Sequence, residues 1–362
     1  MGGGYNSTGG TYSHQGREAE DSGMAGQVLM DAISDDRSLT RETDPEKDEV
    51  EESYEEYTQK TEITDRQAKT ISDRRDVIVG ILSKDMEVED SQLIGSYTRG
   101  TMTGPLKKDS DADVMIVLSA EEHRQWIEQK NGPKNCLQGI KRRIQNDPRF
   151  SQTEVTVDQN VVKVKYHDST IEIVPAFRYS EVPHANHPNG GISGWFTDAS
   201  DGYAIPDTHN GQSWQGTNPR RYKQMFDARD RTHRGKLSAL TRTMKKWSER
   251  NDSGIRSYHM ETMVYNYFEE KARSGDRVPE SHEELTRDFV HSLPRRVKKR
   301  SATEPVYGEQ VDSGQNWRER RQTAKKAKQA SEKLEEAKRL KEEGRTDDAK
   351  QKLKEVHGED FS

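Results

Sequence analysis

The chain has 362 residues, a formal net charge of −6, 29% hydrophobic residues and 34% charged residues. This composition is too polar for one globular core that fills the whole length, so we expect a folded body with disordered ends. No apolar stretch approaches the roughly 20 residues that a membrane-spanning helix needs, which excludes a membrane-embedded helical protein.

Residues 1–60 form an acidic segment. They contain fifteen Asp or Glu and five Lys or Arg, a net charge of −10, which leaves +4 on the rest of the chain. Few of them are apolar, so we expect disorder apart from a short helix around Val28, Leu29 and Ile33. The segment has no cleavable apolar region, so it is not a signal peptide, and we expect a cytoplasmic protein.

The folded body begins at a capping-box pattern, in which Thr64 precedes Gln67 at the start of a helix. This helix carries apolar residues at helical spacing: Ala68, Ile71, Ile78, Ile81 and Leu82. It leads to a turn at Gly95 and Ser96, whose backbone N–H groups and hydroxyl suit a triphosphate.

Two carboxylates stand at the start of an apolar, β-branched run at 110–118. In a strand Asp111 and Asp113 point to the same face, because side chains alternate. Their oxygens suit Mg²⁺, which also keeps phosphate oxygens in its coordination shell. A solvated turn before a strand is the simpler explanation of such a pair, but the Gly-Ser turn upstream favours nucleotidyl transfer.

A two-metal site needs a further acidic ligand on a neighbouring strand. Residues 161–166 and 171–177 are two predicted strands joined by a turn, and Glu172 lies within the second. Because Glu172 alternates with apolar neighbours, it also fits the solvent face of an edge strand, consistent with Pro175 nearby. Asp168, in the turn, is a less suitable ligand because a turn is less preorganised.

The other segments of this half are predicted to pack or to connect. A capped helix begins at Ser119, and a helix at 136–144 buries Cys136, whose single thiol excludes an internal disulfide and a cysteine-rich zinc site. Residues 180–218 are predicted as long connections. The histidines in this stretch lack tight ligand spacing, so we expect no metal site at His184, His187 and His209.

The second half of the folded body begins with a basic segment. Residues 218–247 contain ten Lys or Arg against two Asp, a net of +8, which suits both nucleoside triphosphates and a nucleic-acid backbone. Lys245 lies off the apolar stripe of a predicted amphipathic helix. Ser257 precedes another helix, where its ordinary role is an N-cap; phosphate binding is compatible with that role.

Two further helical regions end the chain. Ser281 caps a core helix that is followed by the basic run 294–300. Residues 317–355 have high helix propensity and sparse apolar positions, so we expect a helical pair that packs on the core and turns near Gly344. Its leucines do not hold a heptad, which argues against a coiled coil.

Several motifs together resemble the polymerase-β-type nucleotidyltransferases, and within them the cGAS/DncV-like group (CD-NTases) that makes cyclic di- and oligonucleotides. These motifs are Gly95-Ser96, Asp111-x-Asp113 and Glu172-Ile173-Val174-Pro175-Ala176. A second block, 237–247 followed by 257–261, resembles the helical half of that group and of the 2′-5′ oligoadenylate synthetases. The resemblance covers about residues 63–293, and 356–361 resembles a degenerate form of the family's closing segment.

The resemblance implies roles for individual residues. Asp111, Asp113 and Glu172 would be catalytic and would hold two Mg²⁺ or Mn²⁺ ions. The family usually has aspartate where this chain has Glu172, which keeps the charge but adds a methylene. The nucleotide-binding residues would be Gly95, Ser96, Lys245 and Ser257, which face phosphates, and Tyr258, which stacks on a base.

We therefore expect an α+β fold with a polymerase-β-like mixed sheet and a second, helical lobe that resembles oligoadenylate synthetases. The expected parts are a disordered acidic segment (1–60), a catalytic lobe (61–215), a helical lobe (216–300) and a charged helical segment that packs on the core (301–362).

The resemblance implies a cyclic di- or oligonucleotide second messenger, made from nucleoside triphosphates with release of pyrophosphate, for antiviral defence (CBASS). The product would reach a downstream effector, and a regulatory protein or RNA is a further partner. A linear oligonucleotide synthetase or an RNA 3′-end nucleotidyltransferase is the alternative among enzymes. An inactive fold that binds nucleotide or RNA is the alternative of another class. The bases, linkage and ring size depend on loop shape, which the sequence leaves open.

Overall fold

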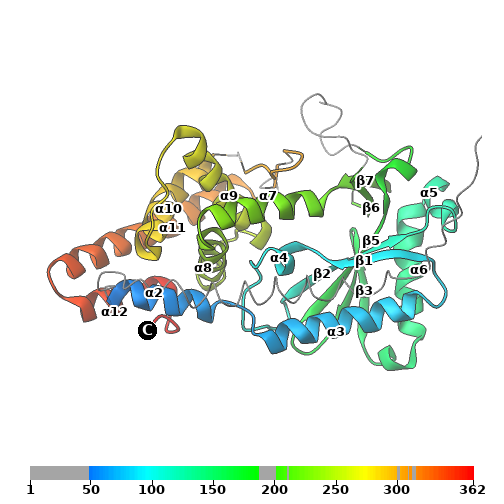
Figure 1. Cartoon of the computed structure of the whole chain (residues 1–362), viewed down its shortest axis with the longest axis horizontal. Helices are drawn as coiled ribbons and strands as arrows, with labels where there is room; N and C mark the ends of the chain where they lie inside the picture. Colours follow the sequence, from blue (N-terminus) through cyan, green and yellow to red (C-terminus); the bar gives the residue numbers. More distant parts are fainter. Residues whose placement is uncertain (1–48, 187–200, 210–211, 300–301, 309, 312–314) are drawn as a thin grey trace, which may run out of the picture. The chain divides into compact units, whose positions relative to one another are not determined.

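The computed structural model describes residues 49–186, 201–209, 212–299, 302–308, 310–311 and 315–362 (Figure 1). The acidic residues 1–48, with the helix expected near Val28, lie outside the described residues, and so does His187. Contacts divide the chain after Asp48, and Glu49–Ser362 forms one unit.

The first part of this unit, called the sheet lobe here, contains all the strands of the described residues. They are β1 (Val88–Leu93), β2 (Asp111–Leu118), β3 (Glu154–Asp158), β4 (Val161–Lys165), β5 (Thr170–Arg178), β6 (Tyr203–Asp207) and β7 (Ser213–Thr217). The helices of this lobe are α3 (Asp65–Leu82), α4 (Gly95–Thr98), α5 (Arg124–Glu128) and α6 (Gly132–Asn146).

The second part, called the helical lobe, combines one helix from before the sheet with those that follow it. They are α2 (Glu49–Lys60), α7 (Pro219–Thr232), α8 (Lys236–Arg250), α9 (Ser257–Ser274), α10 (His282–Lys298), α11 (Trp317–Glu342) and α12 (Thr346–His357).

The sheet is mixed and runs β1-β2-β5-β4-β3, with β6 paired to β5 and β7 to β6. β2 and β5 run parallel with Asp113 opposite Glu172, and the other pairs are antiparallel. β5 is therefore a central strand, and the edge-strand interpretation of Glu172 is wrong. Pro175 is tolerated because the pairing of β4 with β5 extends only to Ile173, so no ladder bond to β4 is lost.

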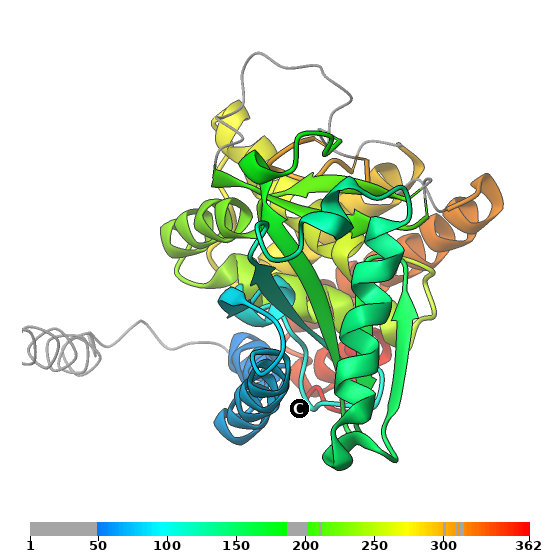
Figure 2. The same ribbon diagram turned by 90° about the vertical axis from the view of Figure 1, so that its right-hand side faces the viewer.

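The two faces of β2 have different surroundings, because successive side chains alternate. Ala112, Val114 and Ile116 pack into a core with the buried stripes of α3 and α6, and Figure 2 shows α6 lying along the sheet. Asp111 and Asp113 belong to the opposite face, next to the small cluster around Met115 and Val117. The fold thus keeps one face of β2 clear of its covering helices.

Two of the three predicted helices of the sheet lobe are confirmed. α3 starts with the capping box of Thr64 and Gln67, and its apolar stripe is buried. α6 buries Cys136 as predicted. The helix expected at Ser119 starts later, at Arg124, after a turn in which Ser119 Oγ accepts from the Glu122 N–H.

The helical lobe encloses its own core. α8 buries the predicted apolar stripe, Leu237, Leu240, Met244 and Trp247, against α2 and the other helices. The predicted C-terminal pair is also confirmed, since α11 and α12 pack on this core and turn at Gly344. Its φ of +76° lies in the left-handed region that favours glycine.

The structure corrects the expected extent of the acidic segment. Residues 49–60 form α2, whose Val50, Tyr54 and Tyr57 are buried. Their spacing makes one apolar stripe along the helix. This stripe packs on the helical core and on Phe361, and its burial stabilises the helix despite the acidic composition. Composition averaged over sixty residues hid this stripe.

The region predicted as long connections is partly β-structure. β6 and β7 form an antiparallel pair that extends the sheet beside β5, and the expected lobe boundary at residue 215 falls inside β7. β6 pairs along its length with β7 and at its start with the end of β5, at Phe177 and Arg178. Among the described residues, no helix is both long and apolar enough to cross a membrane.

The C-terminal His357 predicts a measurable pH dependence. Its Nε2 lies 3.0 Å from Tyr54 Oη, and its ring stacks on Phe361. Burial, aided by the charge of Arg250, lowers the pKa of His357 to about 3. Below the ordinary pKa of about 6.5 only the unfolded chain takes up this proton, so stability falls as pH drops from 6.5 towards 3.

We expect the free energy of unfolding to fall by about 2 kcal/mol from this group between pH 7 and pH 5. Urea unfolding at both pH values measures it. His357→Phe should remove most of this loss, whereas His167→Phe, at a side chain 86% exposed, should keep it. An unchanged pH dependence in His357→Phe contradicts the prediction.

Candidate active site

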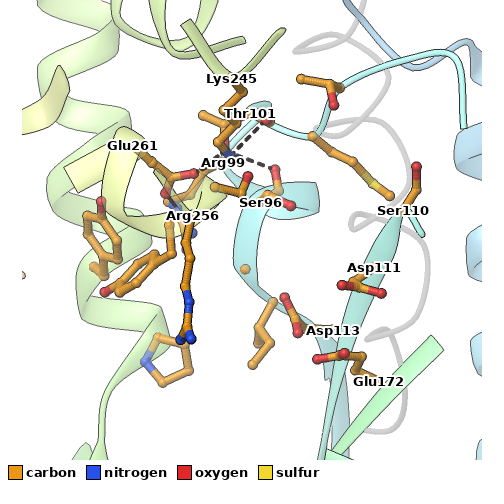
Figure 3. Close-up of a pocket in the computed structure, with 18 of the residues that line it drawn as sticks. Ser96, Arg99, Thr101, Ser110, Asp111, Asp113, Glu172, Lys245, Arg256 and Glu261 are labelled. Atoms are coloured by element: carbon orange, nitrogen blue, oxygen red, sulfur yellow. Dashed lines mark hydrogen bonds and ion pairs between the residues drawn. The ribbon is translucent and has the colours of Figure 1, made fainter. Parts of the chain in front are cut away.

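A cavity of about 1000 Å³ lies between the two lobes. The sheet lobe lines it with β2, α4, β5 and the loops beside them, and the helical lobe with residues of α7, α8 and α9. Figure 3 shows the carboxylates on one wall and the helical residues facing them. The cavity size suits a nucleotide or another ligand of that size.

The carboxylates predicted for catalysis lie together on this wall. Asp111 and Asp113 project from the same face of β2, and Glu172 projects from β5 beside them (Figure 3). The parallel register places Asp113 directly opposite Glu172. The structure therefore brings together the three residues that the sequence indicated.

The negative charges of these three carboxylates repel one another. Burial and then the charge of Glu172 raise the pKa of Asp113 to about 7. The same causes, in the same order, raise the pKa of Asp111 to about 6, although Lys163 works against them. In the described part of the chain neither aspartate has an ion-pair partner, so a bound cation would relieve the repulsion.

The donor set fits the expected Mg²⁺ or Mn²⁺ by its chemistry, because both ions prefer oxygen ligands. As the side chains stand, no group of three His, Cys, Asp or Glu in the described residues is gathered closely enough to hold an ion. Glu172 Oε1 instead lies 2.9 Å from Lys163 Nζ. The two metal ions thus stay a prediction that rests on donor type and shared face.

Gly95 makes room for Asp113. It begins α4 with a φ of +68°, and a Cβ at this position would lie 2.1 Å from Asp113 Oδ2. Ser96 follows on the cavity wall, and its carbonyl accepts from the N–H groups of Thr101 and Met102. The glycine is required here by both backbone conformation and contact.

Comparison with known families identifies the chain. Residues 49–230, half of its length, match the family described as Second Messenger Oligonucleotide or Dinucleotide Synthetase domain (SMODS). The chain belongs to the SMODS family. The matched region contains Gly95, Asp111, Asp113 and Glu172, and it starts at α2.

Relatives of this SMODS chain include a probable cyclic nucleotide synthase of Bacillus cereus (strain VD146), 24% identical over 201 residues. That alignment covers 49% of this chain and 55% of the relative, so the chain matches about half of that relative's length.

Two solved structures share the fold. The structure of CdnC from Escherichia coli MS115-1 in complex with HORMA-deltaN has a TM-score of 0.61 at 15% identity, covering 87% of this chain and 98% of CdnC. That of Bradyrhizobium diazoefficiens CdnG with GTP has a TM-score of 0.62 at 11% identity, covering 87% and 96%. The mixed sheet and helical lobe are thus those of CD-NTases, as the sequence indicated.

Lys245, predicted to contact phosphate, is buried in the SMODS chain within an ionic cluster. Its Nζ lies 2.8 Å from Glu261 Oε2 and 3.1 Å from the Thr101 carbonyl oxygen. Arg99 Nε lies 2.6 Å from Glu261 Oε1, and the guanidinium stacks over the ring of Tyr222. Lys245 still lines the cavity, and its phosphate contact stays a prediction.

Sequence reasoning missed Arg99, Thr101 and Glu261, which join the two lobes through this cluster. Although burial opposes it, the charges of Arg99 and Lys245 lower the pKa of Glu261 to about 2. A usable signal was present: Glu261 lies between buried Met260 and Thr262 on α9, and a carboxylate on a buried helix face needs a cation.

Half of the cations in the basic segment of the helical lobe are paired with carboxylates. Five of its ten cations bond to carboxylates: Arg220 to Asp90, Lys223 to Asp227, Arg229 to Glu269, Arg242 to Glu62 and Lys245 to Glu261. Lys246 lies on the cavity wall. The formal charge of +8 therefore overstates the positive charge with which the segment can bind a polyanion.

Ser257 and Tyr258 open α9 at the cavity. The N-cap is Arg256 and not Ser257, so the ordinary interpretation of this serine as a cap is wrong. Both side chains are exposed, and the ring of Tyr258 meets that of Tyr222 edge-on. Their predicted contacts with phosphate and base remain untested, but their position on the cavity wall suits them.

The loop that leads into α9 is held by the C-terminal region. Three consecutive carbonyls accept bonds from it: Asp252 from Lys326 Nζ, Ser253 from Thr323 Oγ1 and Gly254 from Gln315 Nε2. The same loop lines the cavity from 252 to 257. The wall of the candidate active site thus includes backbone positioned by α11.

Proposed function

We propose that this SMODS chain is a nucleotidyltransferase that joins nucleoside triphosphates into a cyclic di- or oligonucleotide. The observation that carries the proposal is the set of Asp111, Asp113 and Glu172, side by side on β2 and β5 at the cavity between the lobes. Family membership and the ligands named for relatives, GTP for CdnG among them, support the substrate class.

In the proposed reaction a ribose hydroxyl attacks the α-phosphorus of a nucleoside triphosphate. A bond forms between the hydroxyl oxygen and the α-phosphorus. The bond between the α-phosphorus and the oxygen that bridges it to the β-phosphate breaks, and pyrophosphate leaves. Asp111, Asp113 and Glu172 would hold two divalent cations, which when bound neutralise charge on the phosphates. Glu172 would also orient the attacking hydroxyl and accept its proton, and the cavity would hold the reactants in line.

The other cavity residues would position the substrates. Gly95 and Ser96 would face the triphosphate of the donor, with Lys245 and Ser257 on the opposite wall. Tyr258, with 42% of its surface exposed, would stack on a base. A second transfer would close the ring, and the product would act on a downstream effector in antiviral defence.

A regulatory protein is a further proposed partner. The CdnC structure contains HORMA-deltaN, and a chain with the same fold is a candidate for a comparable interaction. RNA is less favoured as a partner than the sequence suggested, because half of the cations of the basic segment already bond to carboxylates.

The test is to incubate the purified chain with all four ribonucleoside triphosphates and Mg²⁺ or Mn²⁺, treat with phosphatase and identify products by mass spectrometry. We expect a phosphatase-resistant cyclic product that Asp111→Asn does not form. A product that loses terminal phosphates to phosphatase is linear and indicates a linear synthetase. No product with either metal, with and without candidate regulators, contradicts the proposal.

A further inference from the structure

Lys163 extends the row of carboxylates across the sheet. Asp113 on β2 pairs in register with Glu172 on β5, and Glu172 pairs with Lys163 on β4. Residues in register on adjacent strands project from the same face, so the three side chains form one row. The sequence predicts a strand at Lys163 but carries no local signal for this role.

The ammonium group of Lys163 is held from two sides. Its Nζ lies 2.9 Å from Glu172 Oε1 and 2.9 Å from Asp158 Oδ2, at the end of β3. The side chains of Lys163 and Glu172 are 25% and 14% exposed. The ammonium group is therefore paired with a carboxylate on each side.

Glu172 needs such a partner. A glutamate side chain has several rotatable bonds, and fixing it costs rotamer entropy. Asp113, directly opposite on β2, repels its charge, and Asp111 lies on the same face. Lys163 offsets both effects, because it binds Oε1 while the carboxylate still lies beside that of Asp113 (Figure 3).

We propose that Lys163 is a positioning residue that fixes the Glu172 carboxylate for nucleotidyl transfer, with one oxygen bound to the ammonium and the other presented to the reacting groups. This inference rests on the proposed function. It adds a residue that touches neither nucleotide nor metal but determines where Glu172 stands.

The first test measures kcat and KM of Lys163→Met, Lys163→Arg and wild type over a range of nucleotide concentrations at saturating Mn²⁺. Loss of a partner that orients a metal ligand costs about 10–100-fold, so we expect kcat to fall at least tenfold in Lys163→Met. KM for nucleotide should change little, because Lys163 does not face the substrate. Lys163→Arg keeps the charge and should recover a large part of kcat.

Lys165→Met is the matched control. Lys165 lies on the same strand and face, and its Nζ bonds to Glu154 Oε1 at 2.5 Å, away from the carboxylate row. The Lys165→Met variant loses the same charge and the same kind of cross-strand pair as Lys163→Met. Because the lost bond is to Glu154 and not to Glu172, its kcat should stay within twofold of wild type. An equal fall in both methionine variants would overturn the inference in favour of a general structural effect.

A second test uses Mn²⁺ binding and needs no turnover. Calorimetric titration of wild type, Lys163→Met, Glu172→Gln and the double variant forms a cycle. If Lys163 positions Glu172, the Glu172→Gln change weakens Mn²⁺ binding at least about tenfold in the wild-type background. In the Lys163→Met background the same change weakens Mn²⁺ binding by a clearly smaller factor. Equal factors in the two backgrounds would overturn the inference.

The two tests separate failure of the inference from failure of the proposed function. If wild type forms no product, the proposed function fails, while the Mn²⁺ cycle still decides the role of Lys163. If wild type forms product and Lys163→Met forms it at an unchanged rate, the inference fails alone. Circular dichroism of each variant confirms that the differences do not come from unfolding.

Discussion

Asp113→Asn is expected to lower the rate of product formation at least about 100-fold. Replacing a residue that only orients a metal ligand already lowers metal affinity or activity about 10–100-fold. The same change should stabilise the protein in the absence of metal. Asp113 carries a charge beside Glu172 in a partly buried position, and its raised pKa shows that the folded state disfavours that charge. Initial rates and urea unfolding measure the two effects.

Asp109→Asn is the control for this experiment. Asp109 lines the same cavity from the loop before β2, so its replacement changes the net charge of the cavity by the same amount. We expect less than a tenfold loss of rate from it. If both variants lose activity equally, the charge of the cavity and not the position of Asp113 is what matters.

Glu261→Gln is expected to cost about 3–5 kcal/mol in the free energy of unfolding, because it leaves buried charges uncompensated. The side chain of Glu261 is 1% exposed, and those of Arg99 and Lys245 are 5% and 6% exposed. Since its pKa is lowered to about 2, the wild-type carboxylate stabilises the fold above its ordinary pKa, and this stabilisation is lost as pH falls towards 2.

Glu269→Gln, on the same helix, is the matched control for Glu261. It removes a pair with Arg229 whose side chains are 20% and 25% exposed, and we expect a cost of about 1 kcal/mol or less. Urea unfolding at pH 7.5 compares the two. Similar small losses would show that the cluster between the lobes contributes little to stability.

The parts of the site that were predictable are those with a local signal. Alternation along β2 placed Asp111 and Asp113 on one face, and the strand pattern placed Glu172 within β5. Helical spacing likewise predicted the buried stripe of α8, and a helix-forming composition interrupted by a glycine predicted the turn near Gly344. Each of these depends on residues close together in the chain.

The missed features depend on contacts between distant segments. Lys245 lies off the apolar stripe of α8, yet it is buried because this side of the helix meets Thr101 and Glu261. Lys163 shows the same limit: its role depends on the register between β4 and β5. β6 likewise depends on distant pairing, since its first residues pair with the end of β5.

The hydrogen bonds from Gln315, Thr323 and Lys326 to the loop before α9 have a consequence for control of the cavity. They tie the backbone of the cavity wall to α11 and to Gln315 just before it. A movement of α11 would therefore displace this wall, although no residue of α11 lines the cavity. Conversely, a ligand that tightens the loop also stiffens α11, since coupling between two sites is reciprocal.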